Sequence, residues 1–435
     1  MTKKPSSLHV RYLILGGGLT GLSTAYHLEQ QKQTDYLVVE KNSFFGGLCA
    51  SEVKNGFTFD YSGHLLHLHN PYTKQLVRRL LKGNLLRHKR NAFINLYGRK
   101  IPFPFQANLW ALPAKYRRAC VEGALQAAKQ PIQSPKNFEQ WAQQSFGRNM
   151  YECFFKPYNQ KLWQTPLTEL TCDWCGTFVP TPNITQIKQG ARRPGKKSWG
   201  YNSYFYYPKS GGCAALADAL AERVPNTWLS AEVTSINLAN QRALVQGKWV
   251  SYDTLINTLP LPVFLQRCVR LPKHIKQKAS KLKSTSVSVF QIAIGRKITP
   301  FHWIYFPEPE MPFYRVGMQS AFSPYNAPKG TSSLYIETTQ KITPGKATEQ
   351  AIFKTLCQKG IIKEQDKILF SFWRTLNPAY AIYDKYRLDA VTTITRWLQQ
   401  QHTLCAGRYG CWEYSFMERS LLQGKEIASI LGIQA

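Results

Sequence analysis

The stretch VRYLILGGGLTGLSTAYHLEQ, residues 10–30, decides the fold. The apolar residues Val10 to Leu15 predict a buried strand, three glycines follow, and the residues after Thr20 have helical spacing. The glycines form the pattern GxGxxG between a strand and a helix, where backbone N–H groups and the positive helix end bind a phosphate. The stretch therefore predicts the first crossover of a dinucleotide-binding domain.

Each glycine of this pattern has its own expected role. Gly16 permits the tight turn, Gly18 lets the main chain approach a pyrophosphate, and Gly21 lets helix and strand pack closely. Glu40 ends the second predicted strand, DYLVVE at 35–40. A carboxylate at that position accepts hydrogen bonds from ribose hydroxyls, so Glu40 strengthens the prediction.

Composition limits the classes of protein that need considering. A chain of 435 residues is too long for one core, which indicates two or three domains. The 56 Lys and Arg against 25 Asp and Glu give a formal charge of +31, which favours anionic ligands, anionic lipid or nucleic acid. The densest basic run, LPKHIKQKASKLKS at 271–284, predicts a basic helix. No nucleic-acid motif accompanies it, so we expect no specific nucleic-acid partner.

The location and the cysteines give further expectations. No apolar run reaches the roughly 18–20 residues of a membrane helix, and no secretory signal precedes the first strand, so we expect a cytoplasmic protein. The ten cysteines are scattered and predict reduced thiols. The one close pair, Cys172 and Cys175, lacks the second pair that a zinc site requires, so we expect no metal. The sequence leaves open whether this pair is a redox dithiol or a coincidence of packing.

Spacing and turn residues predict further elements along the chain. Helices are expected at 73–87, 347–359 and 388–401 and through most of 107–175, a hairpin at 91–104, a long loop at 178–203, and strands within 227–259 and 285–340.

The segment EKNSFFGGLCAS, residues 40–51, separates FAD from NAD. Its glycine pair, Gly46 and Gly47, follows the acidic residue directly and resembles the extended FAD signature of the flavin amine oxidase and mutase superfamily. YDTLINTLPL at 252–261 resembles the strand that closes the FAD domain there. GRYGCWEYSFMERSLLQG at 407–424 resembles the C-terminal turn that reaches the flavin. The resemblance implies FAD as the cofactor.

Five further blocks narrow the resemblance to one family. They are DYSGHLLHLHN (60–70), RKIPFPFQANLWALP (99–113), FFKPYNQKLWQTP (154–166), SWGYNSYFYYPKSGG (198–212) and WIYFPEPEMPFYRVGMQSAFSPYN (303–326). Together they resemble the UDP-galactopyranose mutase family over nearly the whole chain, within the amine oxidase and protoporphyrinogen oxidase superfamily.

The resemblance implies an α/β fold with a Rossmann-type FAD-binding domain, an inserted helical domain and an inserted antiparallel β-sheet domain. The expected ranges are 7–65, 205–270 and 395–435 for the FAD-binding domain, 105–204 for the helical substrate domain with a mobile loop, and 66–104 and 271–394 for the sheet domain over the flavin.

The activity that the resemblance implies is that of an FAD-dependent sugar-nucleotide mutase. In that family N5 of the reduced flavin attacks the anomeric carbon and holds the sugar while its ring opens and recloses, so pyranose and furanose interconvert without net oxidation. The product would serve cell-surface polysaccharide biosynthesis. A nucleotide sugar is the expected substrate, and NAD(P)H is a candidate reductant.

The family's site residues transfer to matching positions of this sequence. The catalytic set is His64, Arg315 and Arg408. The FAD-binding set is Gly16, Gly18, Leu19, Thr20, Gly21, Glu40, Gly46, Gly47, Leu48, His64, Val233, Arg408, Met417 and Ser420. The substrate set is Phe103, Gln106, Asn159, Trp163, Asn202, Trp303, Tyr305, Arg315, Tyr380 and Tyr414.

Two departures from the family pattern keep other functions open. Phe178 occupies the position of a mobile-loop arginine that clamps the pyrophosphate, and Phe322 replaces a substrate-binding tyrosine. One alternative is therefore an FAD-dependent oxidoreductase of the amine oxidase or protoporphyrinogen oxidase type. Another is a non-catalytic, FAD-stabilised scaffold on an anionic membrane, for which the positive charge is suited. The sequence gives no oligomeric state.

Overall fold

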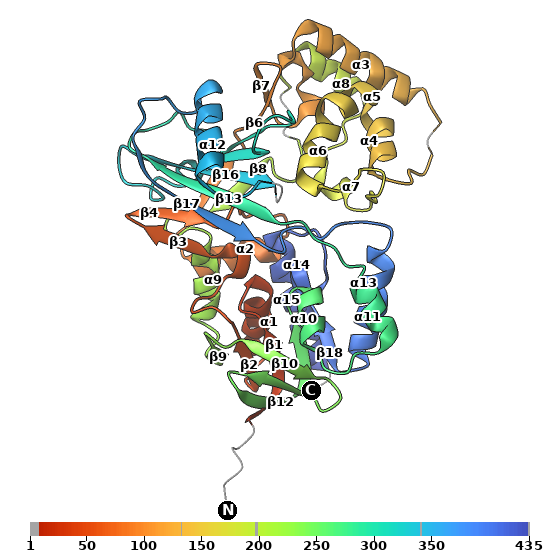
Figure 1. The fold of residues 1–435 in the computed structure, drawn as a ribbon. Coiled ribbons are helices and arrows are strands. Elements are labelled where there is room, and N and C mark those ends of the chain that lie inside the picture. The colour runs from red at the N-terminus through yellow and green to blue at the C-terminus, as the bar shows by residue number, and fades with distance from the viewer. Residues whose placement is uncertain (1–7, 132, 196–198, 340–341, 434–435) are drawn as a thin grey trace, which may run out of the picture.

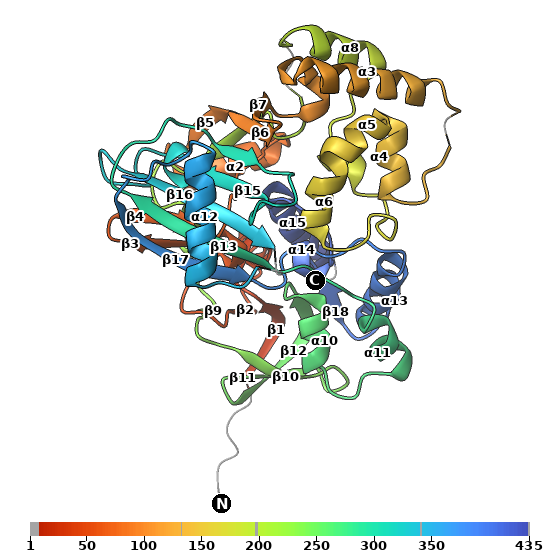
Figure 2. The same cartoon turned by 45° about the horizontal axis from the view of Figure 1, so that its top comes forward.

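The computed structural model describes residues 8–131, 133–195, 199–339 and 342–433. Within these residues two seven-stranded sheets and a group of helices form the molecule (Figure 1). The helical group lies at the opposite end of the molecule from the N-terminal strand in both views (Figures 1 and 2).

The first sheet contains the predicted crossover. Its order is β10-β11-β12-β1-β2-β9, with β18 paired to β12, and β1 runs parallel to both β12 and β2. The strands are β1 (Leu8–Leu15), β2 (Tyr36–Val39), β9 (Thr227–Trp228), β10 (Val233–Asn237), β11 (Arg242–Val245), β12 (Lys248–Asn257) and β18 (Thr403–Cys405).

Both faces of this sheet are buried, because the side chains of its central strand alternate between two cores. Tyr12 and Ile14 join one core, while Leu13 and Leu15 join the other. The helices that contribute to the first core are α1 (Leu19–Gln30), α2 (Pro71–Leu81), α9 (Ala214–Ala221) and α15 (Met417–Ile433). Those of the second core are α10 (Leu261–Arg267), α11 (Lys273–Ala279) and α13 (Arg387–Gln399).

The second sheet is mixed, with order β17-β13-β16-β15-β14-β6-β7, and only its β14–β6 pair is parallel among the pairs described. Its strands are β6 (Ala92–Leu96), β7 (Arg99–Pro102), β13 (Val287–Ile294), β14 (Trp303–Tyr305), β15 (Arg315–Met318), β16 (Ser332–Thr339) and β17 (Ile368–Leu376). Helix α12 (Lys346–Gln358) covers one face through Ile352 and Leu356. Trp303, Tyr305 and Tyr335 lie on the opposite face and join the first core.

Two short ribbons and a buried carboxylate connect these layers. The ribbons pair β3 (Ser51–Lys54) with β4 (Phe57–Asp60), and β5 (Leu86–Lys89) with β8 (Tyr204–Tyr207). Asp60 accepts hydrogen bonds from the Ser51 hydroxyl at 2.6 Å, the Cys213 N–H at 2.9 Å, and Tyr207 and Gln319, each at 2.7 Å. Burial raises the pKa of Asp60, and these four donors compensate its loss of solvent.

The helical group comprises short, closely packed elements. They are α3 (Ala114–Ala128), α4 (Phe138–Phe146), α5 (Arg148–Met150), a π-helical segment (Tyr151–Phe155), α6 (Lys156–Trp163), α7 (Cys175–Phe178) and α8 (Ile184–Arg192). Single 3₁₀ turns cover Gly47–Cys49, Phe105–Ala107, Leu109–Ala111 and Gln319–Ala321. No helix among the described residues combines the length and apolar composition that a membrane span requires.

Most of the expected elements agree with the structure. The basic helix expected at 271–284 is shorter, since α11 covers Lys273–Ala279, and strands β3, β4, β5 and β8 were not anticipated. The crossover strands and the hairpin are confirmed, and Tyr97 and Gly98 have the positive φ angles of its tight turn. The helix expected at 73–87 is wrong at its end: it stops at Leu81, because Lys82 adopts a left-handed conformation. The expected loop at 178–203 contains α8, which Asn183 caps. Strand β17 was not anticipated. The domain ranges stay a prediction.

The buried histidine before β14 should make stability depend on pH. His302 is 7% exposed, its Nδ1 accepts the Asn91 N–H at 2.9 Å, and burial lowers its pKa from 6.5 to about 3. As the pH falls from 6.5 toward 3, His302 binds a proton in the unfolded chain but stays unprotonated in the folded chain. Stability therefore decreases, by at most about 1.4 kcal/mol per pH unit.

We expect His302→Asn, which keeps an acceptor but does not titrate, to lose less unfolding free energy than the parent between neutral and acidic pH. Urea denaturation at several pH values measures this. The matched control is His274→Asn on the exposed face of α11. Equal losses in the parent and both variants would contradict the assignment.

Candidate functional site

A cavity of about 530 Å³ lies where the two sheets and the helical group meet. All predicted FAD-binding residues except Gly21 line it. The predicted substrate residues that line it are Asn202, Trp303, Tyr305, Arg315, Tyr380 and Tyr414. The structure thus brings together residues from both ends and the middle of the chain, although their roles in binding stay predictions.

The glycine turn forms one end of the cavity. Gly16 has φ +105° and donates its N–H to the Val39 carbonyl at 2.9 Å, so the chain turns sharply after β1. Gly18 precedes the first turn of α1, and a Cβ added there would meet no atom closer than the Gly46 oxygen at 4.0 Å. A Cβ on Gly21 would lie 2.0 Å from the Gly16 oxygen. Gly18 therefore leaves open space before the helix, whereas Gly21 is required for packing.

Glu40 lies directly after β2 and is 6% exposed. One carboxylate oxygen accepts the Gly17 N–H at 2.8 Å. The other accepts the backbone and side-chain N–H groups of Asn42 at 2.9 and 2.8 Å. These bonds hold Glu40 at the edge of the cavity, and its remaining lone pairs are available to hydroxyl donors.

Arg315 and Glu337 form a buried ion pair on the second sheet, facing the cavity. They are cross-strand neighbours on β15 and β16, and Arg315 Nη2 donates to Glu337 Oε1 at 2.5 Å. Ser62 donates to the same oxygen. Burial opposes the charge on Arg315, but Glu337 together with Tyr335 and Tyr380 outweighs burial and holds the pKa of the guanidinium above its usual value. The arginine predicted to bind a pyrophosphate is therefore already neutralised.

His64 lies between this ion pair and Arg408. Its Nδ1 is buried without a hydrogen-bond partner among the described residues. Burial, followed by the charge of Arg408, lowers the pKa of His64 to about 4. The imidazole is therefore uncharged at neutral pH, with one N–H donor and one acceptor nitrogen.

Arg408 differs from Arg315, because no ion pair is found for it among the described residues. Its Nη1 donates to the Ser415 carbonyl at 2.8 Å and its Nη2 to the Ala379 carbonyl at 3.0 Å, while Nε is buried and unpartnered. The guanidinium carbon is 5.1 Å from the centre of the Tyr380 ring. Arg408 is thus an uncompensated cation held by two carbonyls and an aromatic ring.

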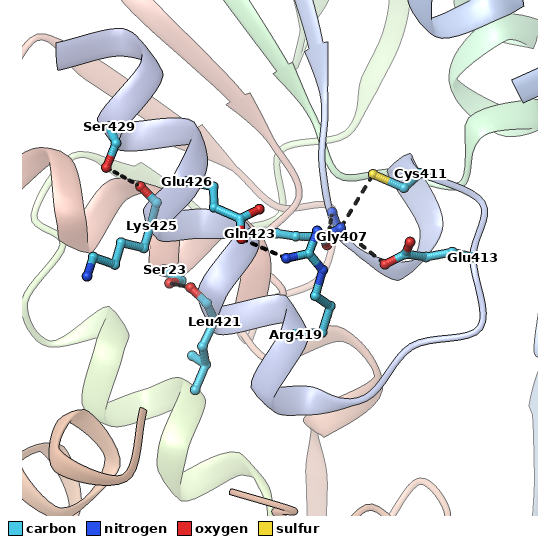
Figure 3. Close-up of polar contacts among 10 residues, drawn as sticks. All are labelled: Ser23, Gly407, Cys411, Glu413, Arg419, Leu421, Gln423, Lys425, Glu426 and Ser429. Atoms are coloured by element: carbon cyan, nitrogen blue, oxygen red, sulfur yellow. Dashed lines mark hydrogen bonds and ion pairs between the residues drawn. The ribbon is translucent and has the colours of Figure 1, made fainter. Parts of the chain in front are cut away.

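The C-terminal helix fixes the turn that carries Arg408 (Figure 3). On α15, Gln423 Oε1 accepts the Gly407 N–H at 2.9 Å, and Nε2 donates to Glu413 at 3.1 Å. Gly407 begins the short helix α14 (Gly407–Gly410). α15 is itself tied to α1, since the Ser23 hydroxyl donates to the Leu421 carbonyl at 2.7 Å. The cation and the glycine turn are therefore held in one rigid unit.

Aromatic side chains form the wall opposite the second sheet. The Phe178 ring lies 4.2 Å from the ring of Tyr414 and 5.5 Å from that of Tyr201. The Phe416 ring lies 6.2 Å from the Phe178 ring. Burial raises the pKa of Tyr414, so its hydroxyl keeps its proton. Phe178 therefore closes an aromatic cluster at the position where the resemblance expects an arginine.

Two predicted substrate residues on α6 lie behind this wall. Trp163 is 1% exposed and packs against Tyr380 with ring centres 5.9 Å apart. Its Nε1 donates to Asn159 Oδ1 at 3.2 Å, and Asn159 Nδ2 donates to the Phe155 carbonyl at 2.7 Å. The structure does not place either side chain in the cavity lining, because protein groups already satisfy both.

Two more predicted substrate residues, Phe103 and Gln106, also lie outside the lining of the cavity. The Phe103 ring packs against Tyr305 at 5.3 Å and beneath the Arg90 guanidinium at 4.7 Å. Gln106 is 1% exposed and donates to the Pro180 carbonyl. Both therefore support the walls of the cavity in this structure instead of facing its interior.

Sequence reasoning missed Glu337 and two half-buried cations. Lys161 donates to the carbonyls of Phe306, Glu308 and Phe313 at 3.0, 2.9 and 2.7 Å, which joins α6 to the β14–β15 connection. Arg90 donates to the Phe103 and Trp199 carbonyls at 3.1 and 3.0 Å. A charged residue directly after the run Leu334, Tyr335 and Ile336 was the available signal for Glu337.

The chain is similar to known flavoproteins in sequence and in fold. Residues 19–431 match the family described as flavin containing amine oxidoreductase. The crystal structure of a reduced UDP-galactopyranose mutase is 25% identical, with a TM-score of 0.91 over 98% of this chain and 96% of that one.

Other solved structures share the fold at lower identity. A protein of Exiguobacterium sp. 255-15 assigned as a protoporphyrinogen oxidase is 16% identical, with a TM-score of 0.76 over 99% of this chain and all of that one. A putrescine oxidase bound to putrescine is 14% identical, with a TM-score of 0.67 over the same shares of the two chains.

Among curated proteins, an uncharacterized protein in nifH2 3′region of Methanothermococcus thermolithotrophicus is 39% identical over 69 residues. The match covers 15% of this chain and 66% of that protein, just under two thirds of its length.

FAD is the cofactor of this protein, in agreement with a family described as flavin containing. The residues present fit it. The turn at Gly18 has room for a phosphate, and Glu40 lies within the same cavity with hydrogen-bond acceptors for hydroxyl groups. Arg408 Nε, His64 Nδ1 and the Ser415 hydroxyl are buried polar groups that lack protein partners.

The two glycines at the start of α1 should respond differently to a methyl group. Gly18 has φ −78°, which alanine adopts freely, and its Cβ would project into open space, so Gly18→Ala should fold normally but lose FAD affinity by about tenfold or more. Gly21→Ala should destabilise the apoprotein by about 1–3 kcal/mol, because its Cβ meets the Gly16 oxygen.

Flavin absorbance per protein and thermal unfolding of the apoprotein measure the two effects. Gly176→Ala is the matched control, since a Cβ there meets nothing within 4 Å. Full FAD affinity in Gly18→Ala would contradict the placement of the phosphate.

Proposed function

The chain belongs to the flavin containing amine oxidoreductase family, and from this premise we propose that it is an FAD-dependent sugar-nucleotide mutase. The observation that carries the proposal is the likeness to a reduced UDP-galactopyranose mutase over nearly all of both chains, together with a tyrosine-walled cationic cavity at the flavin site. We favour an isomerase over an oxidoreductase because Arg408 lines the cavity as a cation without an ion-pair partner among the described residues. An anionic substrate requires such a cation.

When bound and reduced, FAD supplies the nucleophile for the anomeric carbon of the sugar. The chain's own residues bind and orient the substrate. Arg408 attracts the diphosphate, and Tyr380 and Tyr414 donate to its oxygens, since burial raises the pKa of both hydroxyls. The uncharged His64 adds a hydrogen-bonding group without a further charge.

The sheet side of the cavity limits how much negative charge it accepts. Arg315, Glu337, Arg408 and His64 together carry one net positive charge at neutral pH. Arg315 therefore orients a ligand through its remaining N–H groups, with its charge balanced by Glu337. A substrate with a single diphosphate suits this balance better than one with several phosphates.

We further propose a cytoplasmic site of action, a furanose nucleotide product for cell-surface polysaccharide, and NAD(P)H as the reductant. These three assignments depend on the mutase function, and a result that overturns that function overturns them too.

The decisive experiment incubates dithionite-reduced protein with UDP-galactopyranose and related UDP-, GDP- and dTDP-sugars. We expect a furanose product by chromatography and no change in the redox state of the flavin. Oxidised protein should be inactive. Absence of a furanose from every nucleotide sugar, with the flavin intact, would overturn the proposal.

A second candidate, an oxidoreductase for an apolar substrate, is favoured by one observation. The aromatic cluster of Phe178, Tyr201 and Phe416 offers an apolar wall where a phosphate clamp is expected. Under this reading the substrate bleaches the oxidised flavin anaerobically, and air then produces peroxide. The two functions therefore differ in the redox state that reacts.

Restoring a cation at the aromatic wall tests which reading applies. Under the mutase reading, Phe178→Arg should tighten UDP binding by about tenfold, because a charge-assisted hydrogen bond to phosphate contributes about 1.5–3 kcal/mol. Tyr325→Arg, at an exposed position away from the cavity, is the charge-matched control. Titration followed through flavin absorbance measures the affinity. Unchanged or weaker UDP binding in Phe178→Arg alone would favour the apolar substrate.

A further inference from the structure

One basic face of the molecule is formed by α11, α13 and the loop residues that adjoin them, away from the cavity lining. We call it the α11–α13 face and define it by its exposed residues Lys273, Lys276, Lys281, Lys283, Lys385, Tyr386 and Leu388. Figures 1 and 2 both show these two helices side by side at one edge of the first sheet. The face therefore combines residues about 110 positions apart in the sequence through the packing of two helices.

Two lysines of this face lie next to one aromatic ring. Lys281 Nζ lies 5.3 Å and Lys385 Nζ 5.1 Å from the centre of the Tyr386 ring. Tyr386 is 45% exposed. An exposed tyrosine between two lysines has an apolar ring and a polar rim, the combination found at membrane interfaces.

The acidic groups next to this face are already neutralised. Asp389 pairs with Lys278 Nζ, and the buried Asp384 lies 3.8 Å from Lys283 Nζ. Two carboxylates are thus compensated while Lys281 and Lys385 have no ion-pair partner among the described residues. The face retains a net positive charge at neutral pH.

Apolar side chains on the same face are not used by the core. Ile275 and Ile394 bury the inner sides of the two helices, whereas Leu388 is 63% exposed. An exposed leucine beside an exposed tyrosine costs solubility unless it meets an apolar surface. Neither Leu388 nor Tyr386 belongs to the hydrophobic cores of the described residues.

We propose that the α11–α13 face binds an anionic lipid bilayer peripherally, with Tyr386 and Leu388 entering the interface and the lysines meeting the headgroups. Stable membrane attachment needs both an apolar and a polybasic contribution, and this face supplies both. A nucleic acid would use the lysines but would gain little from Leu388. The proposal does not depend on the proposed enzymatic function.

The test is flotation of the full-length flavoprotein with vesicles of phosphatidylcholine containing about one third phosphatidylglycerol, compared with phosphatidylcholine alone. We expect binding to the anionic vesicles at low salt, weaker binding at high salt, and none to the neutral vesicles. The double variant Lys281→Glu, Lys385→Glu should bind at least about tenfold more weakly. Leu388→Ser should weaken binding while leaving its salt dependence unchanged.

Matched controls separate this face from the overall charge of the protein. Lys89→Glu, Lys100→Glu reverses two exposed lysines on β5 and β7, and Val53→Ser removes an exposed apolar side chain elsewhere. Equal weakening by the two lysine pairs would overturn the proposal in favour of non-specific attraction. Absence of vesicle flotation, or a preference for RNA over vesicles that Leu388→Ser does not alter, would also overturn it. Flavin content and thermal unfolding show that each variant is folded.

Discussion

The structure depends on the contact of main chain with main chain around the first turn of α1. A Cβ on Gly21 would lie 2.0 Å from the Gly16 oxygen, and the Gly46 N–H donates to the Gly17 carbonyl at 2.9 Å. No side chain fits between these segments, so strand, helix and second glycine pair form one surface. α15 packs against α1 and holds the turn that carries Arg408. The positions of the phosphate site and of the cation therefore depend on the same close packing.

Charge in the cavity is arranged differently from what a count of arginines suggests. Arg315 is paired with a carboxylate that is 1% exposed, and a buried ion pair contributes orientation more than net attraction. Arg408 is held by carbonyl oxygens and an aromatic ring, which leave its charge uncompensated. The two arginines lie on different elements and have different electrostatic roles, although the sequence presents both as similar candidates for a phosphate.

Local patterns predicted the crossover, the hairpin and most helices, because the period of apolar residues and the glycine positions determine them. The ends of elements were less predictable: Lys82 ends a helix through a left-handed conformation, and the stop signal of Gly83 and Asn84 directly after it was overlooked. The resemblance placed six of ten substrate candidates at the cavity, but it did not reveal that Trp163 is buried behind Tyr380. The contact of Glu337 with Arg315 could be found only from the cross-strand register of β15 and β16.

The formal charge of +31 does not explain the chemistry of the cavity, because surface charge acts over a short distance in salt solution. At physiological ionic strength the screening length is about 8 Å, so exposed lysines beyond that distance contribute little to a buried site. The lysines of α11 lie on the surface of the first sheet's second layer, whereas the cavity faces its first layer and the second sheet. Internal cations thus select the ligand, while the external excess acts on extended anionic surfaces. The two have separate physical consequences, so a change in one leaves the other intact.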